Sequence, residues 1–296
     1  MIEKKLVING VEWSYATGGR GRQTVLLFHG AVSGAETMRT LAAALGDDYR
    51  TVAPTIADVR TLDEVCDAVS VILDREHVGR AHVFGGSFGG MLAQAFLKRR
   101  WRQVENLILL GTALPDPSAG ARTERTMRMM RLLPFRLTRA LLKAEMLKQL
   151  SAPAPPELAV RVSELRERLA DYFDRVLMKE TLLARVALGV DFNRNEVYNS
   201  DGHAEWAGRA LIVESCDDPA VTSDERRRLR EAYPRAMVCT FAGSGDMIPL
   251  LRLEELAEVV KAFLKEDYKS PEDLENCPID QWHDRESVAQ ASKSGE

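Results

Sequence analysis

Residues 83–94 read VFGGSFGGMLAQ, which sets a serine among glycines at the junction of a β-type run and a helical run. The pattern is G-x-S-x-G, with Ser87 at its centre and Gly85 and Gly89 on either side. It is typical of a strained strand-to-helix turn that presents a nucleophilic hydroxyl, because neighbouring backbone leaves no room for side chains at the glycine positions. A glycine-rich phosphate loop is the alternative, but the pattern GxxxxGK[ST] is missing. We therefore predict a nucleophile elbow with Ser87 as the attacking group.

Strand-like and helix-like stretches alternate along most of the chain on both sides of this turn. The run TVLLF at 24–28 is apolar after its first residue, as expected of a strand buried on both faces of a sheet. The predicted strands are 5–8, 11–15, 24–28, 50–53, 81–84, 104–110, 210–214 and 237–241, and the predicted helices are 36–46, 62–75, 88–98, 223–233 and 253–265. This alternation predicts an α/β fold with a mostly parallel, eight-stranded sheet and right-handed crossovers.

One long segment interrupts the alternation. Residues 113–206 have a helical pattern rich in methionine, leucine and arginine, so we predict a helical lid inserted after the sixth strand. Residues 1–112 and 207–265 then form the core. Residues 266–296 are acidic with little aliphatic content, which predicts a flexible C-terminal tail.

The overall composition narrows the classes of function. A net charge of −4 argues against a nucleic-acid binder, which would show a basic footprint. The four cysteines form neither a CxxC pair nor a zinc-like spacing with histidine, so we expect no metal site, and no motif indicates a cofactor. The N-terminal residues lack a signal-peptide stretch, and no run approaches the ~20 apolar residues of a membrane span. We therefore expect a soluble, cytoplasmic protein.

A second motif follows the apolar run 24–28. The tripeptide His29-Gly30-Ala31 can place the backbone N–H of Ala31 beside that of Phe88, where the two would bind a developing oxyanion. His29 itself would then be structural. The alternative is a His-Gly turn that only ends the strand.

With these two motifs in place, the chain resembles the α/β-hydrolase superfamily over about residues 5–265. The resemblance implies a catalytic triad in the chain order serine, acid, histidine. In LIVESCDDPAVT (211–222), Asp218 takes the place of the acid and Asp217 is the adjacent alternative. The remaining possibility is that this Asp-Asp-Pro turn only caps the next helix, because Asp favours turns regardless of catalysis.

The position expected to hold the catalytic histidine holds an aspartate. Superfamily members resemble G-x-G-H-x-x-x-L, whereas residues 243–250 read GSGDMIPL, which puts Asp246 in that place. A carboxylate there would be repelled by Asp218 and could not match imidazole as a base near neutral pH. The other histidines outside the His-Gly motif are His77, His82, His203 and His283. We expect none of them to replace the missing base.

A closer resemblance is to the maspardin-like branch of the superfamily. It lies in TLDEVCDAVSVILD with HVFGGSFGGMLAQAF, and in LREAYPRAMVCTFAGSGDMIPLLRLEEL, whereas the acidic turn D-x-x-G-x-G-x-S is replaced by PTIADVRT (54–61). The resemblance implies a non-catalytic, partner-binding protein. We expect a weak or inactive hydrolase that binds a small acyl- or ester-type ligand or a protein partner. The alternative is an active cytoplasmic serine hydrolase, carboxylesterase-like, that uses a non-standard base.

The first part of the helical segment carries a basic face. Its arginines recur at every third residue, with apolar residues between them: Arg122, Arg125, Arg128 and Arg131 alternate with Met127, Met130 and Leu133. Such a face favours peripheral contact with a membrane surface or an acidic ligand. The alternative is an ordinary solvated helix face whose methionines line the interior of the lid.

Overall fold

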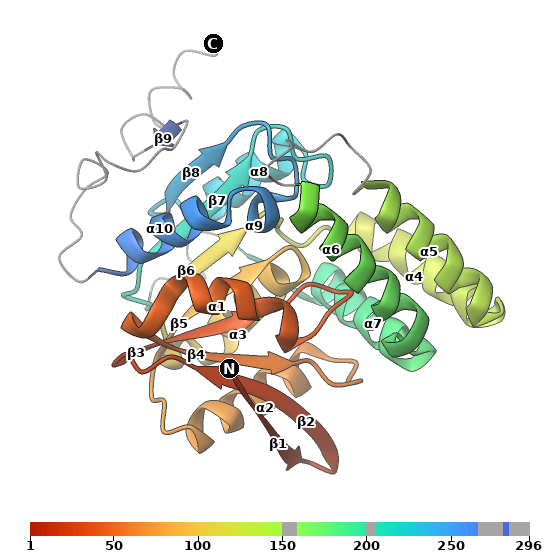
Figure 1. The fold of residues 1–296 in the computed structure, drawn as a ribbon, viewed down its shortest axis with the longest axis horizontal. Coiled ribbons are helices and arrows are strands. Elements are labelled where there is room, and N and C mark those ends of the chain that lie inside the picture. The colour runs from red at the N-terminus through yellow and green to blue at the C-terminus, as the bar shows by residue number, and fades with distance from the viewer. Residues whose placement is uncertain (150–158, 199–204, 266–280, 284–296) are drawn as a thin grey trace. The chain divides into compact units, whose positions relative to one another are not determined.

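Nine strands form one sheet within residues 1–149, 159–198, 205–265 and 281–283, which are the residues that the computed structural model describes. The strand order is β1-β2-β4-β3-β5-β6-β7-β8-β9 (Figure 1). The strands are β1 (Ile2–Ile8), β2 (Val11–Gly18), β3 (Gln23–Phe28), β4 (Tyr49–Thr55), β5 (Ala81–Gly86), β6 (Val104–Leu110), β7 (Ala210–Ser215), β8 (Met237–Phe241) and β9 (Gln281–His283). From β4 to β8 neighbouring strands are parallel, and β1, β2 and β9 pair antiparallel at the two edges. The α/β fold predicted from the sequence is confirmed.

Helices cover both faces of this sheet. They are α1 (Arg39–Leu45), α2 (Leu62–Arg75), α3 (Phe88–Arg100), α8 (Ser223–Ala232), α9 (Ile248–Leu251) and α10 (Leu253–Leu264). Val25 and Leu27 join a buried cluster with α1 and α10, whereas Phe28 meets Phe96 of α3 edge-on, with ring centroids 6.1 Å apart. Successive side chains of a strand point to opposite faces, so β3 is buried from both sides, as its apolar run predicts.

The ninth strand lies in the segment that was expected to be a flexible tail. Residues 281–283 pair antiparallel with β8, so that Gln281 lies opposite Thr240 and His283 opposite Val238. The unpaired edge of β8 offers backbone groups that even a short polar segment can satisfy, so these three residues pair there. The flexibility expected of the tail stays a prediction. The rest of that predicted tail lies outside the described residues.

The chain divides into two compact units. One contains the sheet and consists of Met1–Ala57, Leu62–Pro115 and Glu196–Glu296; the other consists of Asp58–Thr61 and Asp116–Asn195. The larger segment of the second unit, Asp116–Asn195, is helical and falls between β6 and β7 in the chain, whereas Asp58–Thr61 lies between β4 and α2. The role of a lid, which the sequence predicts for 113–206, stays a prediction. In neither unit is any described helix long and apolar enough to cross a membrane.

The helical unit is built from α4 (Pro117–Leu132), α5 (Phe135–Gln149), α6 (Ala159–Asp171), a π-helical turn at Tyr172–Val176 and α7 (Lys179–Asn195). Helix α4 begins where the Asp116 carboxylate accepts a hydrogen bond from the Ser118 N–H at 2.9 Å, with Pro117 in the first turn. Helices α4 and α7 pack together, and Gly120 lets them approach because a Cβ there would lie 2.8 Å from the side chain of Arg194.

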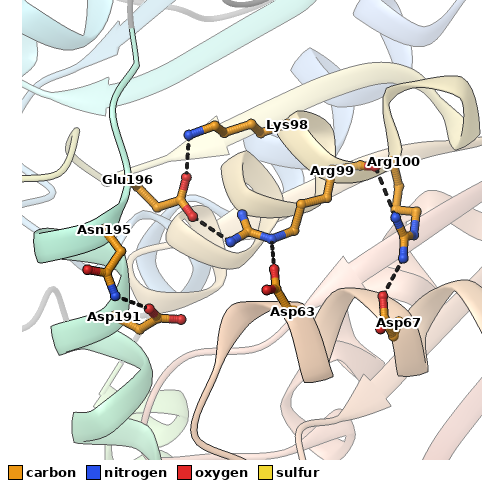
Figure 2. Close-up of polar contacts among 8 residues, drawn as sticks. All are labelled: Asp63, Asp67, Lys98, Arg99, Arg100, Asp191, Asn195 and Glu196. Carbon is orange, nitrogen blue, oxygen red and sulfur yellow. Dashed lines mark hydrogen bonds and ion pairs between the residues drawn. The ribbon is translucent and has the colours of Figure 1, made fainter.

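A buried carboxylate fastens the chain where it returns to the sheet unit. Glu196 follows α7 directly, and its side chain is 2% exposed. It accepts from Lys98 Nζ at 2.8 Å and from Arg99 Nη2 at 2.6 Å, and Arg99 Nε also reaches Asp63 at 2.5 Å (Figure 2). Helix α3 thus holds, through Arg99, both the start of α2 and the segment after α7.

Candidate active site

Ser87 sits at a sharp turn between β5 and α3. Its backbone has φ 51° and ψ −117°, a conformation that costs an L-residue energy and is found at nucleophile elbows. A Cβ at Gly85 would lie 2.1 Å from the carbonyl oxygen of Gly89, and a Cβ at Gly89 would lie 2.4 Å from that of Phe28. Both glycines are therefore required by backbone that cannot move aside, which is the physical reason for G-x-S-x-G.

Backbone hydrogen bonds continue past the strands and tie the loops at the carboxyl edge of the sheet into one framework. The bonds, each 2.9 Å, run from the N–H of Ser87 to Leu110 O, from that of Gly111 to Val213 O and from that of Cys216 to Phe241 O. They link β5, β6, β7 and β8 in order. Because parallel strands end at the same edge, the elbow, the loop of Asp218 and the loop of Asp246 lie along that edge.

Asp218 and Asp246 lie on the loops that follow β7 and β8, near enough for their charges to interact. The pKa of Asp246 is raised from its ordinary value by partial desolvation and by the negative charge of Asp218. Asp218 Oδ1 accepts from the N–H groups of Ala220 at 2.7 Å and Val221 at 3.1 Å, which holds its turn closed. The two carboxyls predicted for the acid and histidine positions are thus brought together. Their catalytic roles stay predictions.

The adjacent aspartate, Asp217, has a structural role. Its carboxylate accepts from the Ser215 hydroxyl at 2.6 Å and from the Gly245 N–H at 3.2 Å, and these bonds, that of Ser215 first, lower its pKa. It therefore ties the β7 loop to the loop of Asp246. Neither aspartate caps the following helix, because Thr222 caps α8 in a capping box with Glu225.

The Ser87 hydroxyl is exposed and makes no hydrogen bond to any residue that the structure describes. His29 is buried, and both of its ring nitrogens are engaged. Its Nε2 accepts from the Ile56 N–H at 3.0 Å, so Nδ1 carries the proton and donates to Gly30 O at 2.6 Å. The ring holds the turn after β3 and has no free nitrogen for Ser87.

His82 lies too far from the elbow to act on it. It is buried on β5, five residues before Ser87, or about 16 Å at the rise of a strand. Its Nδ1 shares a hydrogen bond with the Asn106 amide at 3.1 Å. Burial, followed by the charges of Arg209 and Arg80, lowers its pKa to about 4.

The remaining histidines are placed by the backbone. His77 is exposed beyond the end of α2. The backbone of His283 pairs with Val238, towards the end of β8 away from Asp246, and His203 lies outside the described residues.

The two expected oxyanion donors, the N–H groups of Phe88 and Ala31, lie at the start of α3 and just after β3. Phe88 is the first residue of α3, so its N–H belongs to the helix start, and Ala31 follows β3 by three residues. The close approach of Gly89 to the carbonyls of Phe28 and His29 brings the end of β3 against that helix start. That arrangement is the one an oxyanion hole needs, and the role itself stays a prediction.

Sequence reasoning missed Thr112. Its hydroxyl donates to the carbonyl oxygen of Ser87 at 3.0 Å, and a Cβ at Gly90 would lie 2.6 Å from its side chain. Thr112 thus supports the elbow from the end of β6. The signal available in the sequence was Gly90, the glycine directly after the G-x-S-x-G pattern, but its partner could be found only from the pairing of β5 with β6.

No group of three or more histidine, cysteine, aspartate or glutamate side chains is arranged to hold a metal ion among the described residues. This edge of the sheet therefore offers a hydroxyl, two carboxyls whose charges interact and helix-start N–H groups.

Comparison with known proteins gives the family. The model of the alpha/beta hydrolase family matches residues 25–260. Human maspardin is 26% identical over 275 residues, covering 88% of this chain and 82% of its own, and zebrafish (Danio rerio) maspardin is 23% identical over 259 residues, covering 86% and 78%. An esterase from Thermogutta terrifontis superposes with a TM-score of 0.72 at 20% identity, covering 89% of this chain and 98% of that one. With the elbow and the sheet already described, these matches show that the chain belongs to the alpha/beta hydrolase family and is maspardin-like within it.

Proposed function

We propose that this protein binds a small acyl- or ester-type ligand or a protein partner at the edge formed by Ser87, Asp218 and Asp246, with weak or no hydrolytic turnover. The observation that carries the proposal is the carboxyl of Asp246 where the family chemistry needs an imidazole. A serine hydroxyl is a poor nucleophile until a base takes its proton. Loss of one triad member costs several orders of magnitude in rate, and the residual catalysis comes from the oxyanion hole and binding.

The environment of Asp246 supports this proposal. Desolvation and Asp218 raise its pKa, so the group is more ready to hold a proton than an ordinary aspartate. A base for serine must accept a proton and then return it to the leaving group near neutral pH, and imidazole suits both steps. Two neighbouring carboxyls accept hydrogen bonds, so they suit the recognition of hydrogen-bond donors better than they suit this two-step proton transfer.

A second candidate is an active serine hydrolase, carboxylesterase-like, with a non-standard base. It is favoured by the strain kept at Ser87, which costs on the order of 1–3 kcal/mol and is the conformation that presents a catalytic nucleophile. The pKa of Asp246 is raised, and a carboxylate with a higher pKa is a stronger base. In this candidate mechanism Asp246 deprotonates Ser87 and Asp218 keeps the Asp246 pKa high.

Active-site labelling with a fluorophosphonate probe, together with hydrolysis of a simple aryl ester, separates the two candidates. We expect the wild type and Ser87→Ala to remain unlabelled and inactive, and Asp246→His to gain both labelling and turnover. Asp246→Asn is the matched control, since it removes the charge and adds no imidazole. Wild-type turnover that disappears in both Ser87→Ala and Asp246→Asn would reject the binding proposal and establish the enzyme.

A further inference from the structure

Helices α4 and α5 form a strongly basic element in an acidic protein. Residues 117–149 contain eight basic and two acidic side chains, a net charge of +6, whereas the whole chain carries −4. Some of these cations are engaged: Arg128 pairs with Glu124 and Lys143 with Asp174. Arg125 and Arg136 are exposed and have no hydrogen-bond or ion-pair partner within the described residues. The excess positive charge therefore faces outwards.

Large apolar side chains are exposed on the same element. They are Met129, Leu132, Leu133, Leu137 and Leu141. Leu132 is 87% exposed, a value that a side chain reaches only on a convex surface, with almost nothing packed against it. Single exposed apolar residues are common on soluble proteins, but a contiguous set marks an interaction surface.

On each of the two helices, the spacing gathers the exposed side chains on one face. On α4, Arg125, Arg128, Met129 and Leu132 stand at i, i+3, i+4 and i+7, which is one face of the helix. On α5, Leu137 and Leu141 stand at i and i+4. Leu133 and Pro134 alone connect the two helices, so both apolar ends meet at this corner. We call it the basic corner, defined by Arg125, Arg128, Met129, Leu132, Leu133, Arg136, Leu137 and Leu141.

We propose that the basic corner docks on the surface of an anionic phospholipid bilayer. Its leucines and methionine would enter the boundary between headgroups and acyl chains, while the arginines contact lipid phosphates. Apolar insertion and electrostatic attraction are both needed, since weak apolar insertion needs a basic patch for stable binding. A bilayer fits better than a protein partner, because leucine is under-represented in protein hot spots, whereas four of the five apolar side chains of this corner are leucine and none is aromatic. The charge sign of the corner is opposite to that of the lipid surface and of the rest of this chain.

Vesicle flotation tests the proposal with the full chain. We expect the wild type to float with phosphatidylcholine vesicles that contain about one third phosphatidylserine, but not with phosphatidylcholine alone, and high salt to release it. Reversal of two charges, Arg125→Glu with Arg128→Glu, should lower binding at least about 25-fold, because each basic side chain near an anionic surface contributes roughly fivefold. Leu132→Ser with Leu137→Ser should lower it by more than about tenfold.

Matched controls lie on the sheet unit. Arg20→Glu with Arg22→Glu changes the charge by the same amount at exposed positions between β2 and β3, and Ile2→Ser with Val7→Ser removes exposed apolar groups from β1. Both control pairs should float like the wild type.

The proposal is overturned if the wild type does not float, or if the control pairs lose binding as much as the basic-corner pairs. It is also overturned in favour of self-association if light scattering shows a dimer that Leu132→Ser with Leu137→Ser dissociates. Retention on an acidic-peptide resin without flotation would instead indicate a protein partner.

Discussion

Removal of the Glu196 carboxylate is the sharpest test of how the structure is held together. In Glu196→Ala, Lys98 and Arg99 lose a partner that is almost fully buried. Removing one partner of a buried ion pair costs about 3–5 kcal/mol, because the remaining charge is left uncompensated. Here the two cations keep some water, at 38% and 21% exposure, and Arg99 keeps Asp63. We therefore expect a loss of about 2–3 kcal/mol in the free energy of unfolding.

Urea unfolding followed by tryptophan fluorescence and by far-ultraviolet circular dichroism measures this loss. The midpoint should fall while the slope is unchanged, since the surface exposed on unfolding stays the same. Asp63→Ala is the matched control: it removes the other partner of Arg99, but Asp63 is 77% exposed, so we expect a loss of no more than about 1 kcal/mol. An equal, small effect of both substitutions would refute the reasoning, because the burial of Glu196 would then carry no energetic weight.

Three further predictions concern the elbow and the sheet. Ser87→Gly should raise the free energy of unfolding by about 1 kcal/mol in urea titration, since glycine relieves the backbone at φ 51°. Gly89→Ala should lower the thermal midpoint and cost about 2–3 kcal/mol, because the new methyl meets backbone oxygens that cannot yield. His82→Gln should remove a pH dependence: the wild-type ring has its pKa lowered from 6.5 to about 4 in the fold, so stability is full above pH 6.5 and falls by about 3 kcal/mol as the pH drops to about 4.

Each of these has its own check. Ser87→Ala should bring no gain in stability, because alanine keeps the strained conformation, so equal gains from both variants would contradict the strain argument. Gly79→Ala should be neutral, since nothing lies within 4 Å of the new Cβ. A slope of stability against pH that persists in His82→Gln would show that other groups cause it.

The sheet and the elbow could be predicted from the sequence because their signals are local. The run at 24–28 is apolar on both faces, and the glycines around Ser87 mark the turn without any knowledge of neighbours. Strand β9 could not be predicted in this way. The tripeptide at 281–283 has no apolar pattern, and it pairs only because β8 leaves an edge open.

The sequence predicts which residues belong to the candidate site, but it does not predict the contacts and hydrogen bonds between them. The positions of Asp218 and Asp246 follow from the motifs, but their mutual approach depends on the register between β7 and β8. The tether formed by Asp217 and the support that Thr112 gives to Ser87 are likewise products of strand pairing. The same holds for Glu196 and Lys98, which are 98 residues apart in the chain.

The late position of β9 in the chain also affects how the sheet is completed during synthesis. The strand is translated about 40 residues after β8, a delay of roughly 2–8 s at usual elongation rates. Until then the growing polypeptide offers β8 as a bare template for foreign strands. A nascent chain stalled or cut in this interval would therefore be the form most prone to aggregate, which gives the late segment a protective value independent of any ligand.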